Sequence, residues 1–288
     1  MFFSVITPAF NAQQTIRAVF ESLNAQTFKS FEWIVIDDGS EDDTSLVVAD
    51  LKSTGSFPIT VLRTANNHKK GAIGEGLKLA SGFMSLIADA DDTFPEDALQ
   101  HLYECWQALP DKTAFNGITG LCVDQNGQII GDCFPQSPMD CDLIEMRLLH
   151  RIEGEKWGCV ITAQLREVYP DFSGVAGHIP EGIYQRKLAN KKQRCVNKVI
   201  RIYHTNVAGS ITNSGFNPIN AQGILLDAID WLDNYKKYFK IAPLHFIKRA
   251  AAYNKYLKYL TAAQRSAVKP QTGFARLLIL LTVCARFL

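Results

Sequence analysis

The sequence predicts an α/β fold in which a mostly parallel sheet is flanked by helices, with a C-terminal helical extension. Over the first hundred residues, short apolar runs rich in β-branched residues alternate with segments of helical periodicity, the pattern of parallel strands joined by right-handed crossovers. From residue 219 onward the pattern is helical throughout. The turn-rich segment 209–218 separates the two parts, so we expect a body of residues 1–215 and an extension of residues 216–288.

The elements of the first hundred residues follow from periodicity and turn signals. The first strand, Phe2–Thr7, stops at Pro8, and Asn11 is the expected cap of a helix with apolar residues at 16, 19, 20 and 23. The same patterns then predict strands Trp33–Ile36, Ile59–Leu62 and Phe83–Ala88 and helices Leu46–Leu51 and Gly71–Ser81.

Beyond Pro95 the pattern is less regular. The polar residues Asp124–Gly127 predict a hairpin turn between Thr113–Val123 and Gln128–Cys133. The remaining expected elements are a strand at Val196–Tyr203 and helices at Glu96–Leu109, Asp140–His150, Glu181–Lys191, Ile224–Tyr238 and Leu244–Leu260, followed by a terminal apolar piece.

Composition places the chain among globular proteins, and its charge is unevenly distributed. Hydrophobic residues make up 47% and charged residues 20%, which excludes a disordered or fibrous chain. The net charge of +1 combines 19 basic and 29 acidic groups in residues 1–233 (−10) with eleven basic and no acidic groups in residues 234–288 (+11). Such polarisation usually has a partner.

The basic extension, residues 236–288, has the composition of a membrane-surface segment. It combines Lys and Arg with Tyr, Phe, Leu and Ile and lacks acids, which suits an anionic membrane. Nucleic acid is the rival partner, but no RNA- or DNA-binding module is found, so we expect none. The structural alternative is a solvated helical face whose apolar side packs on the α/β body.

Cysteines and apolar runs bear on location. The seven cysteines are scattered, without CxxC or zinc spacing, and so are expected to be reduced thiols of a cytoplasmic protein. The N-terminus lacks the basic and apolar regions of a signal peptide. The most apolar run, Leu277–Ala285, has about half the length that a spanning helix needs. We therefore expect a protein bound peripherally to the cytoplasmic face of the inner membrane.

Three acids follow the strand Phe83–Ala88. Asp89, Asp91 and Asp92 would repel one another without a cation, and hard carboxylate oxygens suit Mg²⁺ or Mn²⁺ together with substrate phosphates. The alternative is a solvated turn that caps the helix beginning at Glu96. In parallel sheets ligands bind beyond the carboxyl ends of strands, where these acids lie.

Two further polar clusters occupy equivalent positions. Asp37 and Asp38 follow the second strand and could bind a nucleoside, or could simply form a turn. Lys69 and Lys70 precede a helix N-terminus, which favours phosphate, although they could also be ordinary exposed loop residues. The glycines at 71, 74 and 76 do not form G-x-G-x-x-G, and no P-loop occurs, which excludes dinucleotide dehydrogenases and P-loop NTPases.

These segments together resemble family 2 glycosyltransferases, which use nucleotide sugars and have the GT-A fold. The resemblance lies in SVITPAFN (4–11), IVIDDGS (34–40) with Asp43 and Thr44, and GLKLASG (76–82) leading to DADD (89–92). It covers residues 3–100 and extends loosely over 150–212. Tyr203-His204 and Ser210–Thr212 resemble the family's final motif before its C-terminal helices.

The resemblance implies roles for individual residues. The expected nucleoside-binding residues are Pro8, Ala9, Phe10, Asn11, Asp37 and Asp38. Asp89 would face the ribose or the donor sugar, and Asp91 would bind the Mn²⁺ or Mg²⁺ that bridges the diphosphate. Relatives usually have Ala-Arg-Asn where this chain has Ala72-Ile73-Gly74. Lys69 or Lys70 is therefore expected to replace the missing basic contact to the donor.

The acceptor side rests on the second half of the chain. Relatives place the base of inverting transfer before a helix, where this chain has Glu181 ahead of Arg186 and Leu188. The alternative for Glu181 is an acid that stabilises a helix N-terminus. His178 is a second candidate on the acceptor side, and Trp157 could stack on an acceptor sugar or belong to the core.

The sequence thus predicts a metal-dependent inverting glycosyltransferase of cell-surface polysaccharide synthesis. A UDP-sugar is the expected donor, and a saccharide or lipid-linked saccharide the expected acceptor. A sugar-1-phosphate nucleotidyltransferase is one rival, but it would need a glycine- and Arg/Lys-rich loop in place of Pro8–Asn11. A non-catalytic GT-A-like binding module at the membrane is the other, favoured by the altered Ala72–Gly74 and by Gly182 after the acid.

Overall fold

The computed structural model describes residues 1–172, 175, 177–204 and 217–284. The chain divides into two compact units, Met1–Asp171 with Lys187–Ser210 and Phe172–Arg186 with Ile211–Leu288. The expected boundary at 209–218 falls largely outside the described residues, and the limits 1–215 and 216–288 stay a prediction. The segment Phe172–Arg186, expected in the body, is grouped with the helical unit.

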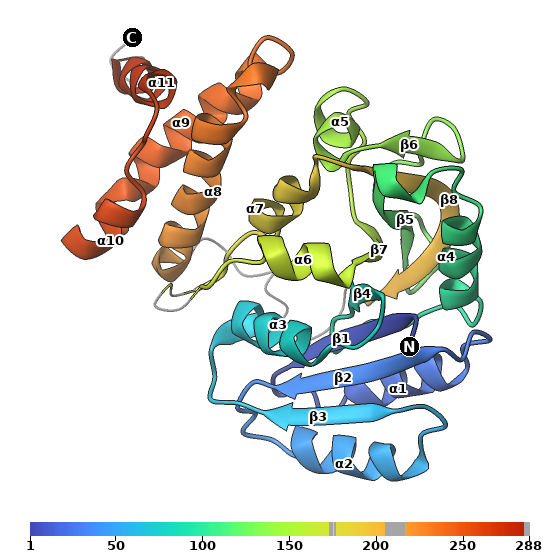
Figure 1. The fold of residues 1–288 in the computed structure, drawn as a ribbon. Coiled ribbons are helices and arrows are strands. Elements are labelled where there is room, and N and C mark those ends of the chain that lie inside the picture. Colours follow the sequence, from blue (N-terminus) through green and yellow to red (C-terminus); the bar gives the residue numbers. More distant parts are fainter. Residues whose placement is uncertain (173–174, 176, 205–216, 285–288) are drawn as a thin grey trace. The chain divides into compact units, whose positions relative to one another are not determined.

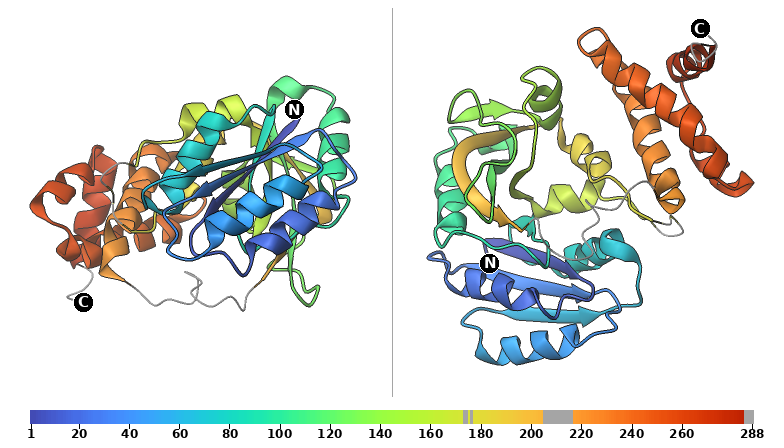
Figure 2. Two further views of the ribbon diagram at one scale, coloured as in Figure 1. Left: turned by 90° about the horizontal axis from the view of Figure 1, so that it is seen from below. Right: turned by 180° about the vertical axis from the view of Figure 1, so that it is seen from behind.

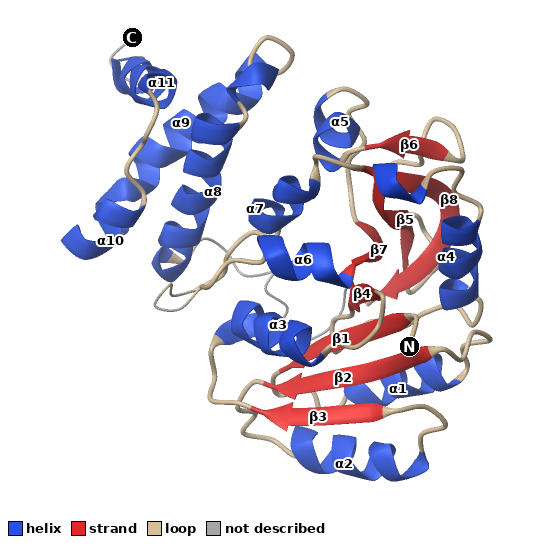
Figure 3. Cartoon of the chain, in the orientation of Figure 1, coloured by secondary structure: helices blue, strands red, loops and turns tan. Residues whose placement is uncertain are grey.

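The first unit is built on an eight-stranded sheet with the order β3-β2-β1-β4-β7-β5-β8-β6 (Figures 1 and 3). Its strands are β1 (Phe3–Ala9), β2 (Phe31–Asp37), β3 (Ile59–Arg63), β4 (Met84–Ile87), β5 (Phe115–Asp124), β6 (Met139–Cys141), β7 (Lys156–Ile161) and β8 (Lys192–Tyr203). Four of the seven neighbouring pairs are parallel, and β7 joins the parallel strands β1–β4 to the mixed half through antiparallel pairing. The mostly parallel sheet of the sequence prediction is confirmed.

Helices cover both faces of the parallel strands, with α1 and α2 on one face and α3 on the other (Figure 2). The helices of this unit are α1 (Ile16–Asn24), α2 (Thr44–Thr54), α3 (His68–Leu79), α4 (Ala98–Gln107), α5 (Leu143–Leu148) and α6 (Thr162–Val168). Gly76 allows α3 to lie close to β1, because a Cβ on it would come within 2.3 Å of Ile6 Cγ2. This glycine therefore serves packing and not a phosphate loop.

The second unit is helical within the described residues. Its helices are α7 (Gly182–Gln185), α8 (Ala221–Asn234), α9 (Pro243–Tyr256), α10 (Ala262–Ala267) and α11 (Gly273–Cys284), with 3₁₀ turns at Pro218–Asn220, Lys236–Tyr238 and Leu257–Tyr259. These helices bury apolar side chains among themselves, notably Ala221, Leu225, Tyr253, Leu260 and Val268. No described helix has both the length and the apolar character needed to cross a bilayer.

A buried arginine ties the start of this unit to α8. Arg186 lies 2.9 Å from Asp227 and donates from Nε to Asp230 at 2.8 Å. Its guanidinium also lies over the ring of Trp231, at 4.7 Å from the centroid. Because a buried cation requires such partners, the segment that carries Glu181 is held to α8 by charge and by stacking.

Three local expectations were wrong. Asn11 does not cap α1, because it adopts a positive φ of 50° in the preceding loop and Thr15 occupies the N-cap position. The turn expected at Asp124–Gly127 forms, but Gln128–Cys133 makes only an isolated bridge to the end of β5, between Ile129 and Val123, and does not continue as a strand. The helix expected at Glu181–Lys191 is shortened to α7 and a 3₁₀ turn at Arg186–Leu188, because the chain enters β8 at Lys192.

Glu32 on β2 offers a direct test of how this fold is stabilised. Its side chain is 9% exposed. One oxygen accepts hydrogen bonds from Ser4 Oγ (2.6 Å), from the Ser81 N–H (2.7 Å) and hydroxyl (2.8 Å), and from the Gly82 N–H (3.2 Å). Burial raises the pKa of Glu32, but these hydrogen bonds together lower it by more than burial raises it, so the net shift is downward. Glu32 thereby joins β1 and β2 to the connection between α3 and β4.

We expect Glu32→Gln to lower the free energy of unfolding by about 1–3 kcal/mol at pH 7, because it places an amide where several donors converge. Since the folded pKa is depressed, the contribution is fully present above the unfolded value of 4.5 and is lost as the pH falls through the lower folded pKa. Urea unfolding at pH 7 and at acid pH measures this. Glu21→Gln, on the exposed face of α1, is the control, and equal losses in the two variants would contradict the prediction.

Candidate functional site

The loop after β1 is joined to the loop after β2 by hydrogen bonds. The Asn11 N–H donates to Ser40 Oγ at 2.9 Å, and the Asn11 side-chain oxygen accepts from the Glu41 N–H at 2.8 Å. Phe10 stands out of this loop with 48% of its surface exposed, whereas Ala9 is buried. The segment expected to hold a nucleoside is therefore ordered in advance and presents an aromatic ring at the carboxyl end of the sheet.

Asp37 organises the loop after β2. It is fully buried, accepts from the Ser40 N–H at 2.8 Å, contacts the Ser45 hydroxyl and lies 3.6 Å from the Arg63 guanidinium. Burial raises the pKa of Asp37. Hydrogen bonds from Ser45 and Ser40 and the charge of Arg63 together lower it by more, so the net shift is downward. Asp37 is thus a carboxylate at neutral pH, with both oxygens contacting groups of the protein.

Asp38 joins the ends of β2 and β3 to the start of α3. It is almost fully buried and accepts from the Asn67 N–H at 2.8 Å and from Thr64 Oγ1 at 3.4 Å. Burial raises its pKa more than these hydrogen bonds lower it. The turn-forming alternative of the sequence analysis therefore describes much of what Asp37 and Asp38 do here, and nucleoside contact stays a prediction for both.

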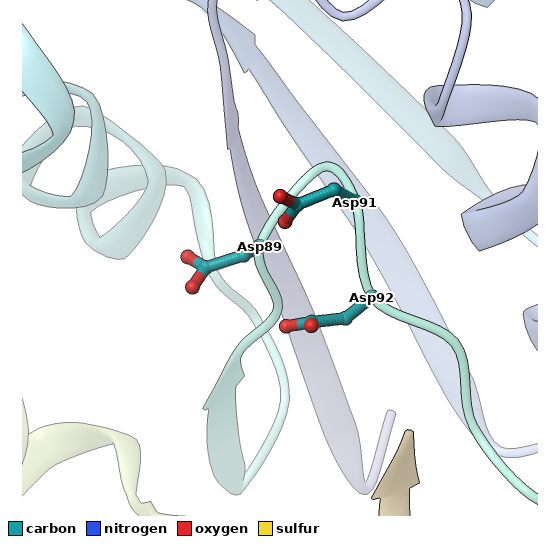
Figure 4. Close-up of side chains that lie close together, drawn as sticks. All are labelled: Asp89, Asp91 and Asp92. Carbon is teal, nitrogen blue, oxygen red and sulfur yellow. The ribbon is translucent and has the colours of Figure 1, made fainter. Parts of the chain in front are cut away.

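The acids after β4 form the carboxylate cluster of the site. One oxygen from each of Asp89, Asp91 and Asp92 lies within 4.8 Å of the others, and the three side chains project from a single loop (Figure 4). Asp92 is fully buried, whereas Asp89 and Asp91 are partly exposed. Burial and the neighbouring Asp89 carboxylate raise the pKa of Asp91. The mutual repulsion that the sequence implied is therefore present in the folded protein, and the donor set is one that a hard divalent cation fits.

Two protein cations contact this cluster. Lys69 Nζ lies 2.6 Å from Asp89 Oδ1, and Arg201 of β8 lies 3.3 Å from Asp89 Oδ2 and 2.6 Å from Asp92 Oδ2. Burial raises the pKa of Asp89. The charges of Lys69 and Arg201 together lower it by more, so the net shift is downward. Sequence reasoning placed Lys69 here but missed Arg201. The available signal was a charged residue within the apolar strand sequence VIRIY.

The loop and β8 are also joined through the backbone. Thr93 and Ile202 exchange N–H···O=C hydrogen bonds of 3.1 Å and 2.8 Å. The Thr93 hydroxyl lies 3.1 Å from His204 Nε2. Strands far apart in sequence thus fix the acid loop between them. The Ser210–Thr212 part of the motif noted with His204 lies outside the described residues.

The segment Ala72–Gly74, which departs from the family pattern, lies within α3. Ala72 and Ile73 are buried, and Lys70 is also buried, with burial lowering its pKa and its carbonyl accepting from the Tyr169 hydroxyl. Lys69 is the lysine that reaches the acid cluster. This geometry favours Lys69 over Lys70 as the substitute cation.

The acceptor-side candidates occupy other surroundings. Trp157 of β7 is 7% exposed, stacks on Phe94 at 4.8 Å and donates from Nε1 to the Ile87 carbonyl, so the structure gives it a core position. Glu181 occupies the N-cap position of α7 without a capping hydrogen bond from its side chain and is partly exposed. His178 is exposed, and its N–H donates to the Asn220 side chain. The roles of these three residues stay predictions.

Comparison with known proteins finds a family match for the N-terminal part of the chain. Residues 4–124, which span most of β1 through β5 and include Lys69 and the acid cluster, match glycosyl transferase family 2. The match covers less than half of the chain. Arg201 and Glu181 lie outside the matched residues.

The curated relatives that the chain matches are bacterial glycosyltransferases. Amylovoran biosynthesis glycosyltransferase AmsB of Erwinia amylovora is 37% identical over 34% of this chain and 33% of the relative. The UDP-Glc:alpha-D-GlcNAc-diphosphoundecaprenol beta-1,3-glucosyltransferase WfaP of Escherichia coli is 37% identical over 31% of this chain and 35% of the relative. The chain thus aligns with about a third of the length of these relatives.

Solved structures show the same fold over nearly the whole chain. S. aureus TarS residues 1–349 in complex with UDP-GlcNAc align with a TM-score of 0.66 at 17% identity, over 98% of this chain and 89% of that one. A mannosyltransferase from Pyrobaculum calidifontis in complex with GDP-Man and Mn²⁺ aligns with a TM-score of 0.58 at 17% identity, over 98% and 84%. The GT-A-like fold predicted from the sequence is confirmed.

Proposed function

We propose that this protein is a metal-dependent, inverting glycosyltransferase that moves a sugar from a UDP-sugar to a saccharide or lipid-linked saccharide in polysaccharide synthesis. The observation that carries the proposal is the cluster of Asp89, Asp91 and Asp92 beyond β4, beside the ordered loops after β1 and β2 in a family 2 domain. The name of the E. coli relative includes both a UDP-sugar and a diphosphoundecaprenol-linked acceptor.

On the donor side, one set of residues would bind the nucleoside and another would neutralise the charge of the diphosphate. The loop Pro8–Asn11, Asp37 and Asp38 would hold the nucleoside, with the exposed ring of Phe10 available for stacking. Asp91, with Asp89 beside it, would hold Mn²⁺ or Mg²⁺, which supplies positive charge to a departing nucleoside diphosphate. Lys69 adds a protein cation in the same place.

On the acceptor side, Glu181 would take the proton of the attacking hydroxyl. Glu181 is partly exposed, which leaves its carboxylate accessible to an acceptor hydroxyl. The segment that carries Glu181 is held to α8 through Arg186. Inversion follows when the acceptor oxygen attacks opposite the leaving diphosphate.

The proposal is tested by incubating the protein with UDP-, GDP- and CMP-sugars and measuring nucleotide release with Mn²⁺, and again after chelation with EDTA. We expect release of UDP from one UDP-sugar, its loss in EDTA and its return when Mn²⁺ is restored. Formation of nucleoside triphosphate and sugar 1-phosphate from the sugar nucleotide and added pyrophosphate would instead identify a nucleotidyltransferase. Background rates with every donor would contradict the enzyme assignment for those donors.

We further propose that the helical unit binds the anionic cytoplasmic surface of the membrane, where a lipid-linked acceptor would be met. Leu277, Leu280 and Leu281 form one face of α11 and are 57%, 60% and 54% exposed. Another face of α11 packs on α9, since Ala275 and Leu278 are buried and Asn254 of α9 donates a hydrogen bond to the Ile279 carbonyl at 2.8 Å. The exposed basic residues nearby in sequence are Lys248, Lys255, Lys258, Arg265, Lys269 and Arg276. Exposed leucines among basic side chains are the composition of an interfacial segment.

Replacing Leu277, Leu280 and Leu281 together with serine is expected to reduce co-sedimentation with phosphatidylglycerol-containing vesicles about tenfold or more, because the insertion of apolar area is lost. The three side chains are already exposed, so the fold should persist. Leu46→Ser, an equally exposed leucine on α2, is the matched control. Equal sedimentation of both variants, or binding to neutral vesicles alone, would contradict the proposal.

A further inference from the structure

A buried arginine that is distant in sequence from the three acids contacts the acid cluster. Arg201 is 6% exposed and contacts two of the three carboxylates, Asp89 and Asp92. Its guanidinium also lies 5.1 Å from the centroid of the Tyr203 ring, and its Nε has no hydrogen-bond partner among the described residues. The cation is therefore held by the cluster itself and not by a separate hydrogen-bond network.

The charge of the cluster is nearly balanced before any ligand binds. Three carboxylates and the two contacting cations, Lys69 and Arg201, sum to −3 + 2 = −1. Each oxygen of Asp89 contacts one of those cations, and Asp92 Oδ2 contacts Arg201. Among the described ion pairs none involves Asp91. A divalent cation approaching this site would meet one uncommitted carboxylate and the repulsion of Arg201.

We propose that Arg201 is a positioning residue that keeps the acid cluster from binding a divalent cation tightly until the donor diphosphate adds its own negative charge, so that metal and nucleotide bind together. The inference rests on the proposed function, since it concerns the metal of that reaction. It differs in its readout, which is metal binding by the protein without nucleotide.

The experiment titrates Mn²⁺ into nucleotide-free protein and follows the signal of unbound Mn²⁺ by electron paramagnetic resonance. Arg201→Met removes one positive charge, so the net charge of the cluster changes from −1 to −2. We expect this variant to bind Mn²⁺ at least about tenfold more tightly than wild type. Arg201→Lys, which retains the charge, is expected to stay within about threefold of wild type. Thermal unfolding confirms that each variant is folded.

A second pair of variants keeps the test decisive if Arg201→Met fails to fold with Asp92 left unpaired. In Asp92→Asn the buried acid is neutral, so the arginine can be removed without stranding a charge. Mn²⁺ should bind at least about tenfold more tightly to the double variant Asp92→Asn/Arg201→Met than to Asp92→Asn alone. The same affinity with and without Arg201, in either pair, would overturn the inference.

Addition of UDP separates this inference from the proposed function. Wild type should bind Mn²⁺ much more tightly with UDP, and Arg201→Met should gain less from UDP because its site binds the ion already. If UDP-dependent Mn²⁺ binding occurs but removal of Arg201 changes nothing, the inference fails and the proposed function stands. If UDP never promotes Mn²⁺ binding in wild type, the metal dependence of the proposed function fails.

Discussion

Replacing Asp91 with alanine is expected to lower metal-dependent nucleotide release by at least about a hundredfold. Asp91 is partly exposed in the loop after β4, and the described ion pairs of the cluster involve its two neighbours but not Asp91 itself. It is therefore the carboxylate best placed to bind the ion that stabilises a leaving diphosphate. Because the ion acts on charge that develops in the transition state, kcat should fall more than KM rises.

The measurement is UDP release from the donor identified by the panel, at saturating Mn²⁺. Asp50→Ala is the matched control, since Asp50 is an exposed acid on α2 that pairs with Arg17. Asp91→Ala should also lose the response to EDTA, because no activity that depends on the ion remains. An Asp91→Ala protein that kept more than about a tenth of wild-type activity would place the metal elsewhere.

Glu181→Gln is expected to reduce transfer to acceptor by about a hundred- to ten-thousandfold, the contribution of a positioned general base. The amide keeps the shape and position of the side chain at the N-cap of α7 but cannot take a proton. Donor binding does not need that proton transfer, so the Kd for UDP should be unchanged. The rate of acceptor-dependent product formation, with UDP binding measured in parallel, reports both effects.

Glu167→Gln is the control for this change, because Glu167 is an exposed acid on α6. His178→Gln tests the second candidate near the same helix. Loss of activity in His178→Gln with full activity in Glu181→Gln would move the base to the histidine. A merely structural role for Glu181 would lower thermal stability without a selective loss of transfer.

Local sequence patterns were sufficient for the parallel half of the fold. The strands β1, β2 and β4 are short, mostly apolar and mostly buried, and the edge strand β3 is partly exposed. The helix α1 buries apolar residues at helical spacing. Because crossovers between parallel strands have a fixed hand, element order alone places the acids after β2 and β4 at one edge. Lys69 or Lys70 was expected to contact the donor, and the contact of Lys69 with Asp89 came from the structure.

Long-range pairing defeated the same reasoning in the second half. The strand β7 contains Gly158, was not predicted, and exists because β4 and β5 border it on both sides. Conversely, Gln128–Cys133 was expected as a strand but forms only an isolated bridge to the end of β5. Whether a segment becomes a strand there depends on which edge is available, and no local pattern carries that information.

The sequence by itself determined the acid-rich character of the body and the basic, apolar character of the extension, since charge and periodicity are local properties. Only the tertiary structure decided how the charges combine. Arg201, remote in sequence, becomes the counter-cation of Asp89 and Asp92, and Asp37 becomes a buried support of its loop. The physical reason is that a charge changes meaning with its neighbours and its burial, and both are set by contacts between distant segments.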